Sequence, residues 1–125
     1  MKITIAGAGI AGLATALALD ADGHDIEIFE AVQEIKPLGV GINLLPHAAA
    51  VLNGLGVLDD LLKSGVATSE LGYFNRYGQK IWSESRGLYA GQNAPQVSIA
   101  RGELQRILLH HVQKRLGESR IHSGH

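Results

Sequence analysis

The chain has 125 residues, which is enough for one folded domain but not for two full domains. Its 11 basic and 12 acidic residues give a formal net charge of −1 and form no blocks, so the charge pattern indicates neither a nucleic-acid nor an anionic-membrane surface. The chain contains no cysteine, which excludes disulfides, thiolate nucleophiles and cysteine-ligated metal or iron–sulfur sites, and which is compatible with the cytoplasm.

The first 30 residues predict one β-α-β unit. Residues 2–6 alternate β-branched residues and predict a buried strand, and an Ala/Leu-rich segment from about Gly12 to Asp22 predicts a helix. Residues 24–30 predict a second strand. Because such crossovers are almost always right-handed, the two strands are expected to be parallel neighbours.

An apolar leader is the alternative interpretation of residues 3–19. A basic residue, Lys2, precedes an apolar run there, as in a signal peptide. Three glycines in the run weaken a helix by roughly 1 kcal/mol each relative to alanine, and a strand follows too soon for a removed leader. The run is also slightly short of the roughly 20 residues of a membrane span. We therefore expect neither a leader nor a membrane partner.

The remaining segments predict a mixture of short helices and strands. The predicted order is an extended stretch over 41–45, helices over 47–53 and 57–64, a hairpin of 69–75 and 79–84, a strand over 96–100, a helix over 102–116 and the start of a strand at 119–124. The predicted fold class is therefore α/β, with a Rossmann-like β-α-β unit, a parallel sheet and an antiparallel hairpin. We expect this fold to be incomplete, because the last strand has no helix after it.

A glycine motif joins the first strand to the first helix. Gly7-Ala8-Gly9-Ile10-Ala11-Gly12 matches G-x-G-x-x-G, in which the glycines permit a tight turn, the approach of a pyrophosphate to the backbone, and close helix–strand packing. The helix N-terminus offers free N–H groups to phosphates.

An acidic residue, Glu30, ends the second strand, where it is expected to accept hydrogen bonds from the hydroxyls of an adenosine ribose. Its charge favours NAD or FAD over NADP. The alternative is a glycine-rich turn without a ligand and a solvated Glu30. The motif alone does not separate NAD from FAD, although the long insertion after the second strand is less typical of a simple dehydrogenase.

Four segments in order carry a resemblance to a known family. They are GAGIAGLATALAL, the glutamate of EIFEA, PLGVGINLLPHAAAVLNGLGVLDDL and SIARGELQRILL. The chain resembles the N-terminal part of FAD-dependent aromatic monooxygenases of the para-hydroxybenzoate hydroxylase fold. With GQKIWSESRG it is most similar to the phenazine-modifying branch, the 5-methylphenazine-1-carboxylate monooxygenase type.

The resemblance implies an FAD site at named positions. Four residues of the first turn would face the FAD pyrophosphate: Gly7, Gly9, Ala11 and Gly12. Glu30 would contact the adenosine ribose and Ala31 would lie beside it.

A second group of positions would lie nearer the flavin. The backbone of Val40 and Gly41 would run close to the flavin ring, with Asn43 as a weaker contact. Arg101 would reach the phosphates and the ribityl chain, and Gln105, one turn later, would be a second contact. Lys36 stands where relatives often have arginine, and it keeps the charge but not the planar fork.

The resemblance also implies the reaction and the division of the chain. In this family NAD(P)H reduces the flavin, and O2 is used to hydroxylate an aromatic substrate. Residues 1–68 and 101–125 would form part of the FAD-binding domain, and 69–100 would form part of the substrate domain. Later family segments that bind nicotinamide and the ribityl chain have no counterpart here, so we expect a fragment that is inactive without the missing C-terminal part.

Other candidate sites are weaker. The adjacent His110 and His111 point about 100° apart on a helix and have no spaced metal-ligating partner, so no metal site is predicted. No side chain is predicted to be a catalytic acid, base or nucleophile. Hairpin aromatics such as Tyr73 and Trp82 are expected to pack into a core rather than to line a substrate pocket. The alternative functions are an NAD-binding oxidoreductase domain and a truncated, non-enzymatic interaction module.

Overall fold

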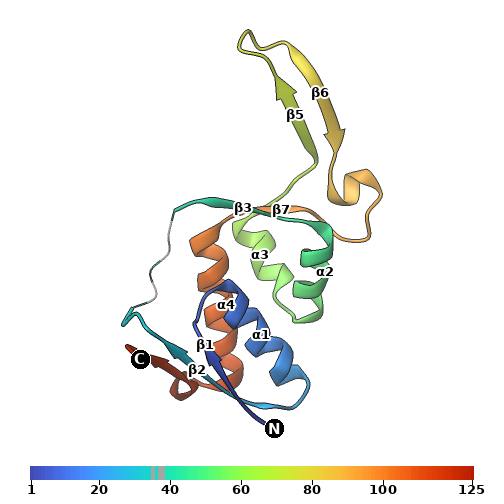
Figure 1. The fold of residues 1–125 in the computed structure, drawn as a ribbon. Helices are drawn as coiled ribbons and strands as arrows, with labels where there is room; N and C mark the ends of the chain where they lie inside the picture. Colours follow the sequence, from blue (N-terminus) through green and yellow to red (C-terminus); the bar gives the residue numbers. More distant parts are fainter. Residues whose placement is uncertain (35, 37–38) are drawn as a thin grey trace. The chain divides into compact units, whose positions relative to one another are not determined.

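The computed structural model describes residues 1–34, 36 and 39–125, which form two compact units. One unit consists of residues Met1–Val40 and Ala100–His125, and the other of Gly41–Ile99. Figure 1 shows the elements of both.

The first unit contains a parallel sheet. Strand β1 (Lys2–Ala6) pairs in parallel with β2 (Asp25–Glu30), and β2 pairs in parallel with β8 (Ile121–Ser123), so the strand order is β1-β2-β8. Helix α1 (Ile10–Ala21) connects β1 to β2 as the sequence predicts. A long helix, α4 (Arg101–Leu116), and a short 3-10 turn, η2 (Glu118–Arg120), precede β8.

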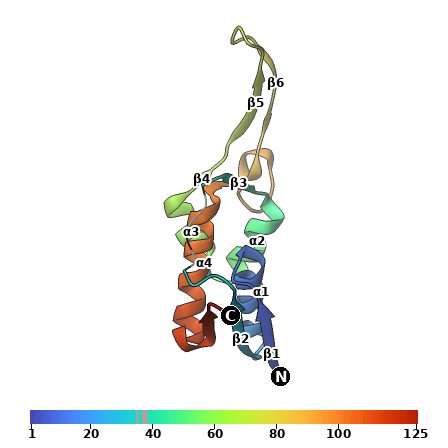
Figure 2. The same ribbon diagram turned by 60° about the vertical axis from the view of Figure 1, so that its left-hand side comes forward.

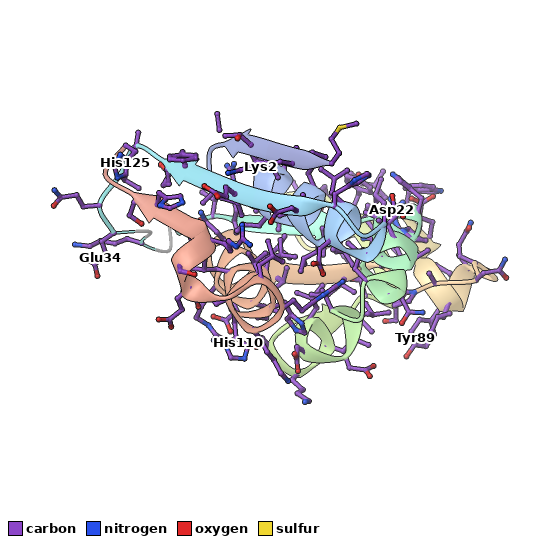
Figure 3. The ribbon with its side chains drawn as sticks, turned by 90° about the horizontal axis from the view of Figure 1, so that it is seen from below. Lys2, Asp22, Glu34, Tyr89, His110 and His125 are labelled. Atoms are coloured by element: carbon purple, nitrogen blue, oxygen red, sulfur yellow. The ribbon has the colours of Figure 1, made fainter. Side chains whose placement is uncertain are left out.

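Helices α1 and α4 pack against each other on one side of the strands (Figures 1 and 3). The sheet contributes Ile26 and Ile28 to the core, because alternate residues of a strand face the same side. The helices contribute the apolar side chains of one stripe each: Leu13, Ala16, Leu17, Leu104, Ile107, Leu108 and Val112. An ion pair of 2.8 Å between Arg115 of α4 and Asp20 of α1 lies beside this core.

Polar contacts fix β8 to the sheet. The Nε2 atom of His122 lies 3.2 Å from the Oε2 atom of Glu27, and the rings of His122 and Phe29 stack with their centroids 4.5 Å apart. Lys2 forms a 3.2 Å ion pair with Glu27. The hydrogen bond and charge of Lys2, and to a smaller extent those of His122, lower the pKa of Glu27. The predicted final strand is therefore confirmed as a strand of this sheet.

The second unit contains two helices and two small sheets. Its elements are β3 (Gly41–Leu44), α2 (Pro46–Gly54), α3 (Leu58–Ser64), β4 (Val66–Ala67), β5 (Glu70–Phe74), β6 (Lys80–Ser85), η1 (Gly87–Ala90) and β7 (Val97–Ala100, whose last residue belongs to the first unit). One sheet has the order β3-β7-β4, and β5 pairs with β6 in an antiparallel hairpin. Apolar side chains of α2, α3 and β7 form the core of this unit.

The hairpin β5–β6 extends away from the rest of its unit (Figures 1 and 2). Tyr73 and Trp82 stack with ring centroids 5.7 Å apart, but each side chain remains 51% exposed. Phe74 and Ile81 are exposed as well. The prediction that these side chains pack into a core is wrong, because nothing in the described residues covers either face of the hairpin.

Candidate functional site

The turn after β1 combines a tight bend with close packing. The N–H of Gly7 donates a 2.7 Å hydrogen bond to the carbonyl of Phe29, and Gly7 has a φ of +102°, a region that favours glycine. A Cβ on Gly12 would lie 2.1 Å from the carbonyl oxygen of Gly7. The fold of this turn therefore requires glycine at both positions, whether or not a ligand binds.

Gly9 is different, because neither its backbone nor its neighbours require glycine. It precedes α1 with an ordinary φ of −74°, and a Cβ there would meet no atom within 4 Å. Open space lies above its Cα, next to the N-terminus of a twelve-residue helix. The fold of the described residues therefore gives no reason of its own for glycine at this position.

Ala8, between the two glycines, is held on both sides. Its N–H donates a 2.7 Å hydrogen bond to Oε2 of Glu30, and its carbonyl accepts a 3.0 Å hydrogen bond from Nε2 of Gln105. Sequence reasoning missed Ala8, because its contacts are made by the backbone and are separated by 22 and 97 positions along the chain. The turn is therefore fixed by the end of β2 and by α4.

Glu30 binds backbone in this structure. Its second carboxylate oxygen, Oε1, accepts a 3.0 Å hydrogen bond from the N–H of Val32. The hydrogen bond from Ala8, and then that from Val32, lower the pKa of Glu30 because both stabilise the charged carboxylate. The carboxylate lies beside the turn, and Ala31 follows it as an exposed residue. Contact of these two residues with a ribose stays a prediction.

A cavity of about 260 Å³ lies over this turn in the first unit. Its lining residues are Gly9, Ile10, Val40, Arg101, Gly102 and Gln105. Four of the residues chosen from the sequence thus meet at one cavity, whereas Ile10 and Gly102 were not chosen. Both missed residues directly follow a chosen one in the sequence.

Arg101 supplies the positive charge of this cavity. It is the first residue of α4, and its backbone N–H donates a 2.7 Å hydrogen bond to the carbonyl of Val40. Its side chain is exposed and has no hydrogen bond or ion pair with the residues that the structure describes. The guanidinium group is therefore available to an anionic ligand.

The other predicted positions lie elsewhere. Lys36 is exposed and pairs with Glu34 at 3.3 Å, and Ala11 is an exposed residue of the first turn of α1. Gly41 and Asn43 belong to the second unit, where Oδ1 of Asn43 accepts a 2.7 Å hydrogen bond from the hydroxyl of Ser98. Their contact with a cofactor stays a prediction.

Two features are absent from the described part of the chain. Within it, no three His, Asp or Glu side chains are grouped as metal ligands would be. Nor does any helix among these residues combine the length and apolar character that crossing a membrane requires.

The chain is similar in sequence and fold to several proteins whose names state an activity. The chain is 50% identical to the phenazine 1,6-dicarboxylic acid hydroxylase PhzS of Lysobacter antibioticus over 123 residues, which are 98% of this chain and 30% of that protein. Its fold matches the solved structure of 2-methyl-3-hydroxypyridine-5-carboxylic acid oxygenase with a TM-score of 0.83 and 28% identity, over 98% of this chain and 31% of that one. Klebsiella pneumoniae HpxO, solved with FAD and uric acid, matches with a TM-score of 0.76 and 30% identity, over 99% and 31%.

These matches confirm the resemblance to FAD-dependent aromatic monooxygenases and to their phenazine-modifying branch. They also confirm the predicted α/β fold class. The chain spans about 30% of the length of the curated relatives that it matches. Residues 2–106 match the family model described as tryptophan halogenase, and the chain therefore belongs to that family.

Proposed function

We propose that this chain is the FAD-binding portion of a flavin-dependent monooxygenase that hydroxylates an aromatic substrate with NAD(P)H and O2. The cavity over the Gly7–Gly12 turn carries the proposal, because it joins an open glycine backbone, a helix N-terminus and an unpaired arginine. Such a combination fits the pyrophosphate of a dinucleotide.

Different residues would contact different parts of the cofactor. The backbone of Gly9 would approach the pyrophosphate, and Arg101 would neutralise it. Glu30 is the proposed partner of the adenosine ribose, which requires one of its backbone hydrogen bonds to be exchanged for one from a hydroxyl group. Bound FAD would supply the redox chemistry, and the protein would supply orientation and electrostatics. Gly41, Asn43 and Lys36 remain proposed contacts.

The family model is named for halogenation, but the similar proteins favour hydroxylation as the reaction. The relative that is 50% identical over 98% of the chain is a hydroxylase, and HpxO was solved with FAD and uric acid. We propose the hydroxylation, its aromatic substrate and its reductant for a protein as long as the relatives, and not for residues 1–125 alone. Residues 1–125 alone are expected to bind FAD weakly and to catalyse no hydroxylation. We further propose a cytoplasmic location, because reduced nicotinamides are regenerated there.

FAD should be the dinucleotide that this chain prefers. The chain should bind FAD with a clear preference over NAD when it is titrated with each separately. Flavin fluorescence measures the binding of FAD, and saturation-transfer NMR of the nicotinamide measures the binding of NAD. Arg101→Gln should weaken FAD binding about tenfold or more, because a charge-assisted phosphate contact is worth about 1.5–3 kcal/mol.

Arg106→Gln provides the matched control on the same helix. Arg106 pairs with Glu103 and does not line the cavity, so this change should leave the FAD affinity within about twofold. Preference for NAD would instead support a simple NAD-binding domain. Equal losses in the two variants would show that the effect of Arg101 is not local.

A further inference from the structure

The peptide unit between Ala8 and Gly9 is held at its carbonyl end. The carbonyl oxygen of Ala8 accepts a 3.0 Å hydrogen bond from Nε2 of Gln105, whereas the N–H of Gly9 donates to no atom among the residues that the structure describes. The C=O and N–H of a planar, trans peptide point in opposite directions. The contact with Gln105 therefore also sets the direction of the Gly9 N–H.

The glycine at position 9 allows this peptide unit to flip. Rotation of the unit by half a turn would carry the φ of Gly9 from −74° into the positive region. A residue with a side chain disfavours that region, but glycine adopts it about as readily as negative φ. Gly9 therefore lacks the steric constraint that would keep the peptide unit in one orientation.

The earlier part of the turn is held independently of Gln105. The N–H of Gly7 donates a 2.7 Å hydrogen bond to the carbonyl of Phe29, and the N–H of Ala8 donates one of 2.7 Å to Glu30. Both bonds are made by peptide units that precede the flexible one, so they do not restrain its rotation. Within the described part of the chain, Gln105 makes the only hydrogen bond to that unit.

The orientation of this peptide unit matters for an anionic ligand in the cavity that Gly9 and Gln105 both line. In the observed orientation Gln105 occupies the carbonyl oxygen and the N–H of Gly9 is free, so the unit offers a ligand a donor and no acceptor. A flipped unit would instead expose a carbonyl oxygen, whose negative partial charge repels phosphate. Backbone N–H groups are the part of such turns that binds phosphate.

We propose that Gln105 is a positioning residue, which holds the carbonyl of Ala8 and so prevents the peptide flip that glycine at position 9 allows. Its effect on the ligand is indirect, because it keeps the N–H of Gly9 available to an anion. The proposal rests on the proposed function in that this anion would be the pyrophosphate of FAD. The motion of the peptide unit is nevertheless measurable without flavin.

The first test measures this motion in the flavin-free, ¹⁵N-labelled chain. Gln105→Met keeps the length of the side chain but removes the donor, and relaxation-dispersion NMR should then show μs–ms exchange at the amide of Gly9 that the unaltered chain lacks. Adding Gly9→Ala should abolish the exchange, because alanine disfavours positive φ. No exchange in Gln105→Met, or exchange that persists in the double variant, would overturn the proposal.

The second test measures the affinity for FAD. Gln105→Met should weaken FAD binding about fivefold, the loss expected for one neutral hydrogen bond. Gln113→Met is the matched control, because Gln113 lies about two turns later on α4 and does not line the cavity. The control should leave the affinity within about twofold. Equal losses in the two variants, or an unchanged affinity in Gln105→Met, would overturn the proposal.

A shorter amide provides a second variant. Gln105→Asn keeps the amide but is one methylene too short for the contact with Ala8, so it should reproduce both effects if Gln105→Met fails to fold, as circular dichroism would show. If the unaltered chain binds no FAD, the proposed function is contradicted. The exchange at Gly9 would still decide whether Gln105 holds the peptide unit.

Discussion

The glycine motif contains three positions, Gly7, Gly9 and Gly12, that are under different structural constraints. Gly7 has a backbone conformation that side chains rarely adopt, and Gly12 lies against the carbonyl of Gly7. Gly9 has neither constraint, so the same substitution at Gly9 and at Gly12 separates ligand binding from folding.

Gly9→Ala should lower the free energy of unfolding by less than about 1 kcal/mol, since its Cβ enters open space at a helix N-cap. Gly12→Ala should lower it by about 2 kcal/mol or more, because the backbone of Gly7 must move. Urea unfolding measures both values, and FAD titration should show a loss of affinity for folded Gly9→Ala. A Gly9→Ala chain with unchanged FAD affinity would show that the cofactor does not approach this backbone.

Glu30 makes the stability of the turn depend on pH. Its pKa is lowered in the folded chain, so the carboxylate stabilises the fold above its ordinary pKa of about 4.3 and this contribution is lost as the pH falls through the lower folded value. Glu30→Gln should destabilise the chain at pH 7, because one of two backbone N–H groups loses its acceptor.

The check is urea unfolding of both chains between pH 7 and pH 3. Their difference should be constant from pH 7 to about 5 and should shrink below about pH 4. Glu34→Gln, which removes only an exposed ion pair with Lys36, should change stability by less than about 0.5 kcal/mol at pH 7. A difference for Glu30→Gln that grows on acidification would contradict this account.

At the scale of elements, periodicity predicted α1, α2, α3 and α4 and their neighbouring strands. The α4 stripe that contains Leu104, Leu108 and Val112 is buried as the helical spacing requires. Three short elements, β4, η1 and η2, were not predicted, because two to four residues carry no periodic pattern. The exposure of the hairpin was not predictable either, since alternation shows which residues share a face but not whether anything covers it.

The hairpin gives a prediction about stability. Trp82→Thr removes a stacked but half-exposed ring, and it should lower the free energy of unfolding by less than about 1 kcal/mol. Leu61→Ala, at a fully buried position of α3 in the same unit, should lower it by about 2–5 kcal/mol. Urea unfolding followed by circular dichroism compares the two. Similar losses would mean that the hairpin is covered in solution.

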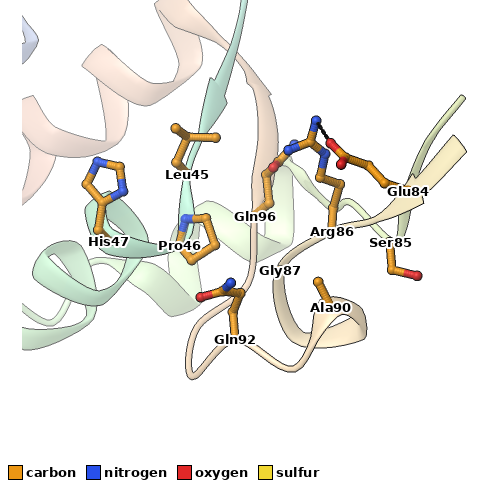
Figure 4. A pocket seen from close by; sticks show the side chains of 10 residues that line it. All are labelled: Leu45, Pro46, His47, Glu84, Ser85, Arg86, Gly87, Ala90, Gln92 and Gln96. Carbon is orange, nitrogen blue, oxygen red and sulfur yellow. Dashed lines mark ion pairs between the residues drawn. The ribbon is translucent and has the colours of Figure 1, made fainter. Parts of the chain in front are cut away.

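At the scale of the whole molecule, the chain divides into two units, and the cavity over the glycine turn lies in the first of them. The glycine motif and Glu30 allowed the first site to be predicted, because each residue type has a known task at its spacing. Arg101 and Gln105 depended on family resemblance, since an arginine and a glutamine on a helix specify no ligand. A cavity of about 440 Å³ in the unit Gly41–Ile99 (Figure 4) was not predicted, because its residues lie in a loop, a strand end and a helix start that no spacing relates.

The two hydrogen bonds of Ala8 have a consequence for how the chain matures. The turn is encoded within the first twelve residues, yet its geometry depends on a carboxylate 22 positions later and on an amide 97 positions later. Contacts so distant in sequence form late in folding, because a long loop must close first. During synthesis the turn therefore cannot reach its final form until Gln105 has left the ribosome. The proposed cofactor can then bind only after most of these 125 residues have been made.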